Sequence, residues 1–430
     1  MRGTELFGAL RERQFRLLWL GQATSTLGDG LVPVAVAFAV IKTLDRGPTA
    51  LGIVLAAESL PLVAFVLAGG VWADRLPRQL VMLASDVIRG LVQATLAVLL
   101  LSGAAELWHL VVLLAIYGSA QAFFQPAATG LVPATVSAPR LQQANALLGL
   151  SRSLAFVVGP AVSGVIAATT NPGIVFVVDA ATFAVSATSL ALLRLPRGRR
   201  ERERQSFVAD LKGGFQELIA HTWLWVIVAW AALFLGIVVA PYMTLGPVIA
   251  KESLGGPAAW GMIAAGWGAG TLAGGLIALR WKPLRPMLVC CAAVLLIAPA
   301  MTLLALRAPA PLVAVLNAVG GGGMGLFAAL WQTTLQQHVR EEALSRVSAW
   351  DWMGSYAFLP LGLLLAGPVS SVIGISSTMW IAVGFIVVST SAVLLVPDVR
   401  NLRRLDEPKP EPDDVLLRLP GEPAEALHGS

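Results

Sequence analysis

Long apolar segments follow one another along nearly the whole chain, separated by short polar stretches. A helix needs about 20 mostly apolar residues to cross a lipid bilayer. Cutting the sequence at its charges, prolines and glycine-rich turns gives twelve such segments, which we predict to be transmembrane helices. They run approximately over residues 17–43, 48–72, 78–102, 107–132, 141–168, 173–194, 223–249, 258–280, 284–306, 311–337, 345–370 and 374–396.

The second half of the chain repeats the first in the same order. The stretch AGGVWADR at residues 68–75 returns about 205 residues later as AGGLIALR at residues 273–280, each time where an apolar segment ends. Internal duplication of a hydrophobic protein is typical of secondary transporters with two related halves. We therefore predict an all-α membrane protein with twelve transmembrane helices in two six-helix halves, residues 1–194 and 223–396.

Two polar segments lie outside these halves. Residues 195–222 begin with a charged run and continue with four apolar residues at helical spacing, Phe207, Leu211, Phe215 and Leu218. We expect a short amphipathic helix on the cytoplasmic membrane surface there, or a tether that simply joins the halves. The tail, residues 397–430, is rich in Pro, Glu and Asp, and we expect it to be disordered.

The composition supports a membrane location. Of the 430 residues, 57% are hydrophobic and 13% are charged, which leaves too little polar surface for a soluble globule. No basic face carries interleaved aromatic residues, so we expect no nucleic-acid partner. Cys290 and Cys291 are adjacent in an apolar run, which suits neither a long-range disulfide nor a metal site. We expect no enzyme activity, metal or cofactor, and we find no phosphate-binding loop of a nucleotide-driven pump.

The basic residues predict the topology. If the N-terminus is cytoplasmic, the outer loops hold only four of the 30 basic residues, namely Lys42, Arg46, Lys251 and Arg307. Apart from two arginines inside apolar segments, the others fall in cytoplasmic segments, so the positive-inside rule places both termini in the cytoplasm. The basic residues are nearly all Arg, which is typical of GC-rich bacteria, so we expect the protein to lie in a bacterial cell membrane. We also expect it to be a monomer.

The loop after the second segment carries a specific pattern, GVWADRLPR, with four residues of interest: Gly70, Asp74, Arg75 and Arg78. It resembles the loop between helices 2 and 3 of the major facilitator superfamily, although Pro77 replaces the loop glycine and Gln79 the last basic residue. The resemblance implies that this loop forms a gating latch against the other half. We expect Asp351, in the eleventh segment, to be its partner. Alternatively, these charges only set the topology.

The fifth segment contains Gly159, Pro160 and Gly164 in the sequence GPAVSG. This resembles the Gly-Pro-x-x-Gly-Gly motif in helix 5 of exporters of the same superfamily, with Ser163 in place of one glycine. A proline bends a helix and small neighbours permit close packing, which suits a helix that rocks between two positions. The motif favours efflux over uptake.

Four further phrases resemble the enterobactin-exporter and macrolide-efflux group: TLGDG at 26–30, FFQPA at 123–127, LQQANAL at 141–147 and FVVDAATF at 176–183. The resemblance implies the major facilitator fold in the lipid bilayer. It also implies secondary active export of an amphipathic small molecule, such as an antibiotic or a siderophore-like metabolite, by proton antiport with alternating access. The alternative is an uptake symporter or a uniporter of a small metabolite.

Charges inside the apolar segments each need a reason, since one at a helix centre costs about 2.5–3.5 kcal/mol. Asp29, Glu58 and Arg152 lie near the middle of the first, second and fifth segments. A desolvated carboxyl group can exchange protons near neutral pH, so these residues are proton-coupling candidates, with Asp29 first. A helix break with the Asp29 carboxylate bonded to backbone is an equal alternative. We expect Arg152 to pair with Asp29 or Glu58.

Three more charged residues in these segments have a structural explanation. Asp86 and Arg89 are three residues apart in the third segment and can satisfy each other on one helix face. Asp179 lies toward the outer side of the sixth segment, which the major facilitator fold places at the periphery. We therefore expect all three to be structural.

Amide and aromatic side chains gather in the fourth and tenth segments, which the major facilitator fold places around the central cavity. A bulky, partly polar guest fits such a lining, whereas hydrogen bonding between helices is the alternative. The cavity candidates are Gln121, Gln125, Asn317, Trp331, Gln332 and Gln336.

Overall fold

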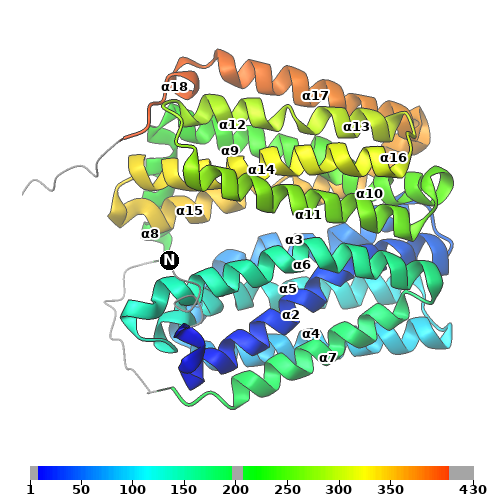
Figure 1. Cartoon of the computed structure of the whole chain (residues 1–430), viewed down its shortest axis with the longest axis horizontal. Coiled ribbons are helices and arrows are strands. Elements are labelled where there is room, and N and C mark those ends of the chain that lie inside the picture. The colour runs from blue at the N-terminus through cyan, green and yellow to red at the C-terminus, as the bar shows by residue number, and fades with distance from the viewer. Residues whose placement is uncertain (1–7, 196–206, 406–430) are drawn as a thin grey trace, which may run out of the picture.

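The computed structural model describes residues 8–195 and 207–405 (Figure 1). For residues 66–75, 207–211, 341, 342 and 345 it describes the backbone alone. Within this part of the chain, twelve helical spans are long and apolar enough to cross a membrane. The predicted all-α fold class is confirmed. The disorder expected for the tail concerns residues that lie outside the described part, from 406 onward.

Six spans form the first half. Their helices are α2 (Arg13–Phe38), extended by the π-helical turn η2 (Ala39–Thr43), α3 (Pro48–Arg75), α4 (Arg78–Ser102), α5 (Leu107–Leu131), α6 (Leu141–Thr169) and α7 (Gly173–Ala191). Short turns flank them, namely η1 (Gly8–Arg11), η3 (Val132–Ala134) and η4 (Ala138–Arg140). Proline opens α3, where its missing N–H costs nothing, and Gly103 ends α4 with a φ of 75°.

Helix α8 (Phe207–Ala220) precedes the second half. The six spans that follow are α9 (Thr222–Phe234) with α10 (Ala240–Ile249), α11 (Pro257–Arg280), α12 (Pro286–Val294) with α13 (Ile297–Ala305), α14 (Ala310–His338), α15 (Glu341–Tyr356) with α16 (Leu359–Ile373), and α17 (Ile375–Leu395). The π-helical turns η5 (Leu235–Val239) and η6 (Ala250–Leu254) follow α9 and α10, and α18 (Pro397–Arg400) follows α17. Pro299 and Pro360 lie in the first turns of α13 and α16, where their missing N–H groups interrupt two spans predicted as single helices.

The two halves repeat one arrangement of helices. In the first half α2 packs on α6, α3 on α5 and α4 on α7. The corresponding pairs in the second half are α10 with α16, α11 with α14, and α12 and α13 with α17. This correspondence agrees with the internal repeat in the sequence.

Glycine lets the two halves approach each other backbone to backbone, in the pairs α6 with α11 and α3 with α16. A Cβ on Gly261 would lie 2.5 Å from the Pro160 carbonyl oxygen, and one on Gly268 would overlap the carbonyl of Phe156. A Cβ on Gly52 would overlap the carbonyl of Leu363 in the same way. Small residues at helix interfaces of membrane proteins permit this close packing.

One end of the bundle holds α8 and both ends of the described chain, and we call it the linker end (Figure 1). The backbone contacts between the halves lie away from the linker end. At the opposite end the Lys251 ammonium bonds to the Ile41 carbonyl and lies 3.1 Å from the Asp45 carboxylate. The halves are therefore joined at the opposite end, and their ribbons diverge toward the linker end.

Helix α8 occupies part of the segment expected to form an amphipathic helix, and it packs against α15 of the second half. Leu218 is buried, and the ring of Phe215 lies 5.0 Å from that of Trp350. Arg340 donates a hydrogen bond of 2.8 Å to the Glu217 carboxylate. Helix α8 is thus docked on α15 of the second half. For Phe207 and Leu211 the structure describes the backbone alone, so their side chains lie outside the described part.

Candidate functional site

Two glycines beside Asp29 let α2 lie directly against its neighbours. A Cβ on Gly28 would overlap the carboxylate of Asp179 on α7, and a Cβ on Gly30 would lie 2.6 Å from the Ala155 carbonyl oxygen of α6. Gly159 of α6 faces the backbone of Gly30 in turn. Helix α2 continues unbroken through this region, so the predicted alternative of a helix break is not found.

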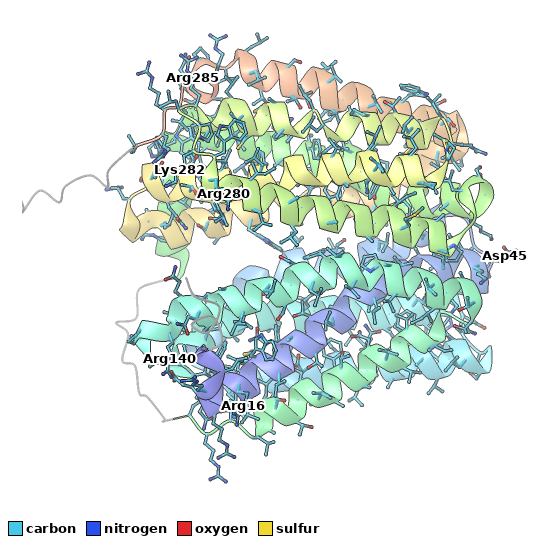
Figure 2. The ribbon with its side chains drawn as sticks, in the orientation of Figure 1. Arg16, Asp45, Arg140, Arg280, Lys282 and Arg285 are labelled. Atoms are coloured by element: carbon cyan, nitrogen blue, oxygen red, sulfur yellow. The ribbon has the colours of Figure 1, made fainter. Side chains whose placement is uncertain are left out.

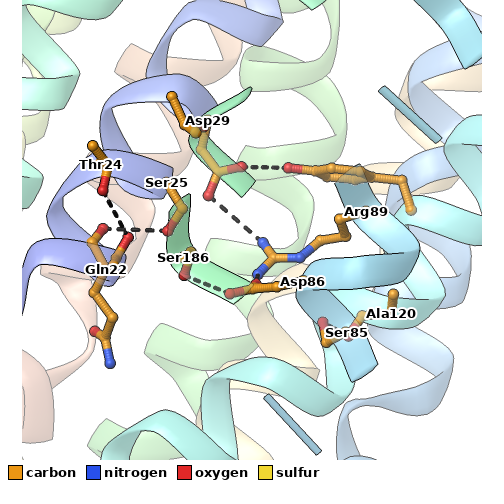
Figure 3. Close-up of polar contacts among 12 residues, drawn as sticks. Gln22, Thr24, Ser25, Asp29, Ser85, Asp86, Arg89, Ala120 and Ser186 are labelled. Carbon is orange, nitrogen blue, oxygen red and sulfur yellow. Dashed lines mark hydrogen bonds and ion pairs between the residues drawn. The ribbon is translucent and has the colours of Figure 1, made fainter. Parts of the chain in front are cut away.

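The Asp29 carboxylate bonds to side chains from two other helices (Figure 3). The Tyr117 hydroxyl of α5 donates to it at 2.5 Å, and the Arg89 guanidinium of α4 lies 3.6 Å away. Arg89 also donates to Asp86 at 2.5 Å, and the Ser186 hydroxyl of α7 donates to Asp86 at 2.6 Å. Four helices of the first half thus contribute to one polar network.

Burial divides this network into a dry part and an accessible part. The side chains of Arg89 and Asp86 are 2% and 0% exposed, whereas that of Asp29 is 32% exposed. The aromatic rings of Phe124 and Phe183 lie 4.4 Å and 4.5 Å from the guanidinium carbon, so they shield the arginine and stabilise its charge. Asp29 is therefore the most exposed acid of this network.

The expected pairing of Arg152 with Asp29 or Glu58 is not found among the described side chains. Arg152 is exposed on α6, one turn from Phe156, which contacts α11. Arg89 takes its place beside Asp29. Glu58 is partly exposed and lies near enough to Asp29 for the two charges to repel each other.

The residues that sequence analysis missed are Tyr117 and Ser186, and it judged Arg89 to be merely structural. Tyr117 is one of three tyrosines in the chain and lies at mid-helix in the fourth span. Two features of the sequence could have indicated this network: a tyrosine hydroxyl in the middle of the fourth span and an arginine in the third. Both groups need a polar partner inside the membrane.

Of the predicted latch residues, the structure describes the side chains of Arg78 and Asp351. Gly70, Asp74 and Arg75 end α3, and their side chains lie outside the described part. Arg78 donates a hydrogen bond of 2.7 Å to the Gly130 carbonyl, within its own half. Asp351 accepts a bond of 2.9 Å from the Trp331 indole, also within its own half. A latch between the two halves therefore stays a prediction.

The predicted exporter motif connects the charged network to the other half. Gly159 faces Gly30 on α2, which is the neighbour of Asp29. One turn along α6, a Cβ on Gly164 would lie 2.9 Å from the Cα of Gly261 on α11. Helix α6 therefore touches the Asp29 region on one side and the second half on the other.

The cavity candidates fall into two groups. Asn317 is buried and donates to the Tyr242 hydroxyl at 2.9 Å and to the Ile263 carbonyl at 2.8 Å, so it joins helices as the alternative proposed. Trp331 is also buried, stacked on Phe327. The remaining amides reach the surface wholly or in part: Gln121, Gln125, Gln332 and Gln336.

Comparison with known proteins assigns the family. The Major Facilitator Superfamily model matches residues 18–358, so the chain belongs to this superfamily. The protein is accordingly a multi-pass membrane transporter of small molecules and not an enzyme.

The chain is similar over nearly its whole length to bacterial efflux proteins. It is 27% identical over 413 residues to the multidrug efflux pump Tap of Mycolicibacterium fortuitum, covering 91% of this chain and 98% of the relative. It is 22% identical over 403 residues to macrolide efflux protein A of Streptococcus pyogenes, covering 91% and 97%.

Solved structures share the fold at lower sequence identity. The nucleoside transporter NupG superposes with a TM-score of 0.68 at 15% identity, over 89% of this chain and 98% of that one. A bacterial homolog of the human lysosomal transporter Spinster, in an inward-facing and unoccupied conformation, gives a TM-score of 0.66 at 16% identity, over 93% and 100%.

Proposed function

We propose that this protein is a secondary active exporter, which moves an amphipathic small molecule such as an antibiotic or a siderophore-like metabolite in exchange for protons. The observation that carries this proposal is the position of Asp29. Its carboxylate is 32% exposed and at the same time bonded to a buried arginine and a tyrosine. An acid between water and a dry ionic network can gain and lose a proton as access changes.

Protonation of Asp29 alters how α2 is held. When ionised, Asp29 shares the charge of Arg89 with Asp86, and Tyr117 donates to it. When protonated, Asp29 no longer attracts Arg89, which then belongs to Asp86 alone. The hold of α4 and α5 on α2 weakens, because charge-assisted hydrogen bonds are about twice as strong as neutral ones.

Helix α6 passes this change to the other half. It touches α2 at Gly159 and Gly30, and it touches α11 at Pro160 and Gly164. A shift of α2 therefore moves the helix that makes the principal contact between halves. Packed helices with backbone contacts have few intermediate positions, so a small displacement favours one of two arrangements.

The linker end is cytoplasmic in this proposal. Basic side chains lie there, as Figure 2 shows, whereas Asp45 lies at the opposite end; the labelled basic residues are Arg16, Arg140, Arg280, Lys282 and Arg285. The positive-inside rule supports this orientation. The halves are then closed on the outside, which corresponds to an inward-facing state. Asp74, Arg75 and Arg78 would meet Asp351 when the cytoplasmic ends approach in the other state.

The cargo binds between the halves. Arg152 is exposed on α6, one turn before Phe156, whose carbonyl lies against α11. Glu58 is partly exposed on α3. The exposed amides of Gln332 and Gln336 on α14 add neutral donors and acceptors from the second half. Amide groups and a few charges around an apolar lining suit an amphipathic guest. The names of the relatives, a multidrug efflux pump and a macrolide efflux protein, support export of such compounds.

Transport into everted membrane vesicles tests the proposal. A panel of fluorescent dyes and a macrolide is offered with an imposed proton gradient, without ATP, and again with an uncoupler. We expect uptake that the uncoupler abolishes, and we expect Asp29→Asn to remove it without lowering the amount of folded protein. Asp398→Asn, in α18 outside the network, is the matched control and keeps wild-type transport.

Four outcomes count against the proposal. Transport that requires ATP would exclude a secondary transporter. Transport that ignores the uncoupler would exclude protons as the coupling ion, and wild-type transport by Asp29→Asn would remove this residue from the mechanism. Movement of the panel in the opposite direction would indicate the alternative, an uptake symporter.

A further inference from the structure

Asp179 is a buried acid whose carboxylate is incompletely bonded. Its side chain on α7 has no exposed surface, and it occupies the space that a side chain on Gly28 would fill. The Thr182 hydroxyl donates to Oδ1 at 3.1 Å. Oδ2 has no hydrogen-bond partner in the described part of the structure. A buried oxygen without a partner is costly, so its protonation state has to be explained.

The groups around Asp179 hold fewer positive than negative charges. Helix α2 presents Asp29, α4 presents Arg89 and Asp86, and α5 presents the Tyr117 hydroxyl. The guanidinium already binds Asp86 at 2.5 Å and lies 3.6 Å from Asp29. Three carboxyl groups therefore share one cation. In a dry site this cation cannot balance all three, so ionised Asp179 would lack compensation while Asp29 is ionised.

Gln93 supplies a second, independent observation. It lies one helical turn beyond Arg89 on α4, is fully buried and faces Asp179. Its Nε2 and Oε1 atoms both lack hydrogen-bond partners. A carboxamide can donate from nitrogen to a carboxylate, and after rotation it can accept at oxygen from a carboxylic acid. A glutamine in this place therefore serves an acid in both protonation states, which an aliphatic side chain or a fixed donor could not do.

We propose that Asp179 is a second proton-binding residue of this network and that Gln93 is its positioning partner. The proposal rests on the proposed proton coupling through Asp29, which is the accessible acid. A proton taken up from water by Asp29 passes to Asp179: the O–H bond on Asp29 breaks, one forms on Oδ2 of Asp179, and Asp29 returns to its ion pair with Arg89. The proton stays on Oδ2 of Asp179, whose O–H group donates a hydrogen bond to Oε1 of Gln93, and reversal of the transfer returns the proton to Asp29 and then to water.

Infrared difference spectroscopy tests this assignment without a cargo. The purified full-length protein in lipid nanodiscs is taken from acidic to alkaline pH, and the carbonyl bands of protonated carboxyl groups are followed in H2O and D2O. We expect one carboxylic-acid band to be lost in Asp179→Asn and retained in Asp398→Asn. Gln93→Leu, which leaves Asp179 in place, should move this band and change the pH at which it disappears.

Either of two results would overturn the proposal. The first is a wild-type set of carboxylic-acid bands in folded Asp179→Asn. The second is that Gln93→Leu leaves every carboxylic-acid band and its pH dependence unchanged, a result that can be judged even if Asp179→Asn fails to fold.

Transport measurements separate failure of this inference from failure of the proposed function. In proteoliposomes loaded with the transported panel compound, we expect Asp179→Asn to keep exchange of cargo against cargo but to lose at least tenfold in proton-driven transport. If wild-type protein moves no protons, the proposed coupling fails whatever the spectra show. If wild-type and Asp179→Asn move equal numbers of protons per cargo molecule, Asp29 alone couples and Asp179 is structural.

Discussion

The first and second halves share one helix arrangement but differ in what fills their cores. The first half buries Asp86 and Arg89 beside Asp29. The second half buries the neutral Asn317, which bonds to the partly buried Tyr242 beside the rings of Trp260 and Trp267. Duplication therefore preserved how the helices pack, whereas the ionisable chemistry is concentrated in one copy. In the proposed function, the first half responds to protons and the second half is the frame against which it moves.

Packing within the halves supports this division. Helices α11 and α14 of the second half meet backbone to backbone at several glycines, including Gly270, Gly274, Gly321 and Gly325. In the corresponding pair of the first half, α3 and α5, the described close approach is that of Gly118 to the Glu58 backbone. Small residues at these positions permit extensive backbone contact between α11 and α14.

The largest expected effect comes from breaking the charge balance of the first half. Arg89→Met leaves Asp86 buried without its cation, and we expect a loss of about 3–5 kcal/mol in stability, because a buried charge without its partner is strongly destabilising. Tyr242→Phe in the second half removes one neutral hydrogen bond, for which about 0.6 kcal/mol is typical in membranes. Thermal unfolding in detergent measures both variants.

A rescue variant sharpens this test. Adding Asp86→Asn to Arg89→Met removes the uncompensated charge and should restore part of the lost stability. Equal losses in Arg89→Met and Tyr242→Phe would show that the two cores do not differ as described.

The next effect concerns the contact between the halves. A side chain on Gly268 would overlap the Phe156 carbonyl, so Gly268→Val should separate α6 from α11 at a cost of about 1–3 kcal/mol, as overpacking typically does. A Cβ on Gly275, on the same helix, meets no atom within 4 Å, so Gly275→Val is the control. Reaction of cysteines introduced at the opposite end with a water-soluble thiol reagent should rise in the first variant alone. Equal reactivity in both would mean that close packing here does not hold the halves together.

A smaller effect is expected at the opposite end itself. Lys251→Gln removes the ammonium that joins Asp45 and the Ile41 carbonyl of the first half to the second half, and about 1 kcal/mol is the scale for such an exposed pair. Arg307→Gln breaks an ion pair with Glu252 inside the second half and is the control. Spin labels at Trp108 and Leu306, exposed at this end, should report a longer distance in Lys251→Gln. An identical distribution in both variants would remove Lys251 from the closure.

The smallest effect is a pH dependence of α8 docking on the second half. The hydrogen bond from Arg340 lowers the pKa of Glu217 below its usual value of 4.5. A lowered pKa stabilises the docked state above that usual value, and this contribution is lost as the pH falls through the folded pKa. Arg340 is 74% exposed, so we expect only a few tenths of a kcal/mol. Trp350 fluorescence between pH 6 and about pH 3 should follow undocking, and Glu217→Gln should remove this dependence.

The first half contains a matched site for that experiment. Hydrogen bonds from Ser137 lower the pKa of Glu12, again below 4.5, and Arg140 adds its charge. Glu12→Gln should weaken the N-terminal segment at neutral pH but leave the Trp350 signal unchanged. A Trp350 change in this variant would mean that acid acts on the fluorescence by another route.

The sequence predicted the fold well because its signals are local. A bilayer-length apolar segment must satisfy its own backbone, so each such segment predicts a helix without knowledge of its neighbours. The sequence analysis did not predict that two spans would be interrupted at Pro299 and Pro360, although both prolines stand in the sequence. The motif glycines also predicted close contacts, and Gly159 and Gly164 do lie where α6 meets α2 and α11.

The candidate site was predicted only in part, because partnership between helices depends on their rotation and depth. Asp86 and Arg89 lie on one helix, so their pairing followed from spacing. The approach of Arg89 to Asp29 did not, and Arg152 was chosen instead. The opposed positions of Gln93 and Asp179 were equally invisible, since each residue has an ordinary explanation when considered alone.

By itself the sequence determined the helical membrane fold, the duplication and the topology expected from its charges. The tertiary structure decided which cation Asp29 meets, which half contains the ionic network and at which end the halves join. The physical reason is that apolar length and periodicity act within one helix. Whether two buried polar groups from different helices bond to each other depends on how closely the helix backbones approach at small residues. A shift of about one ångström is enough to break such a bond.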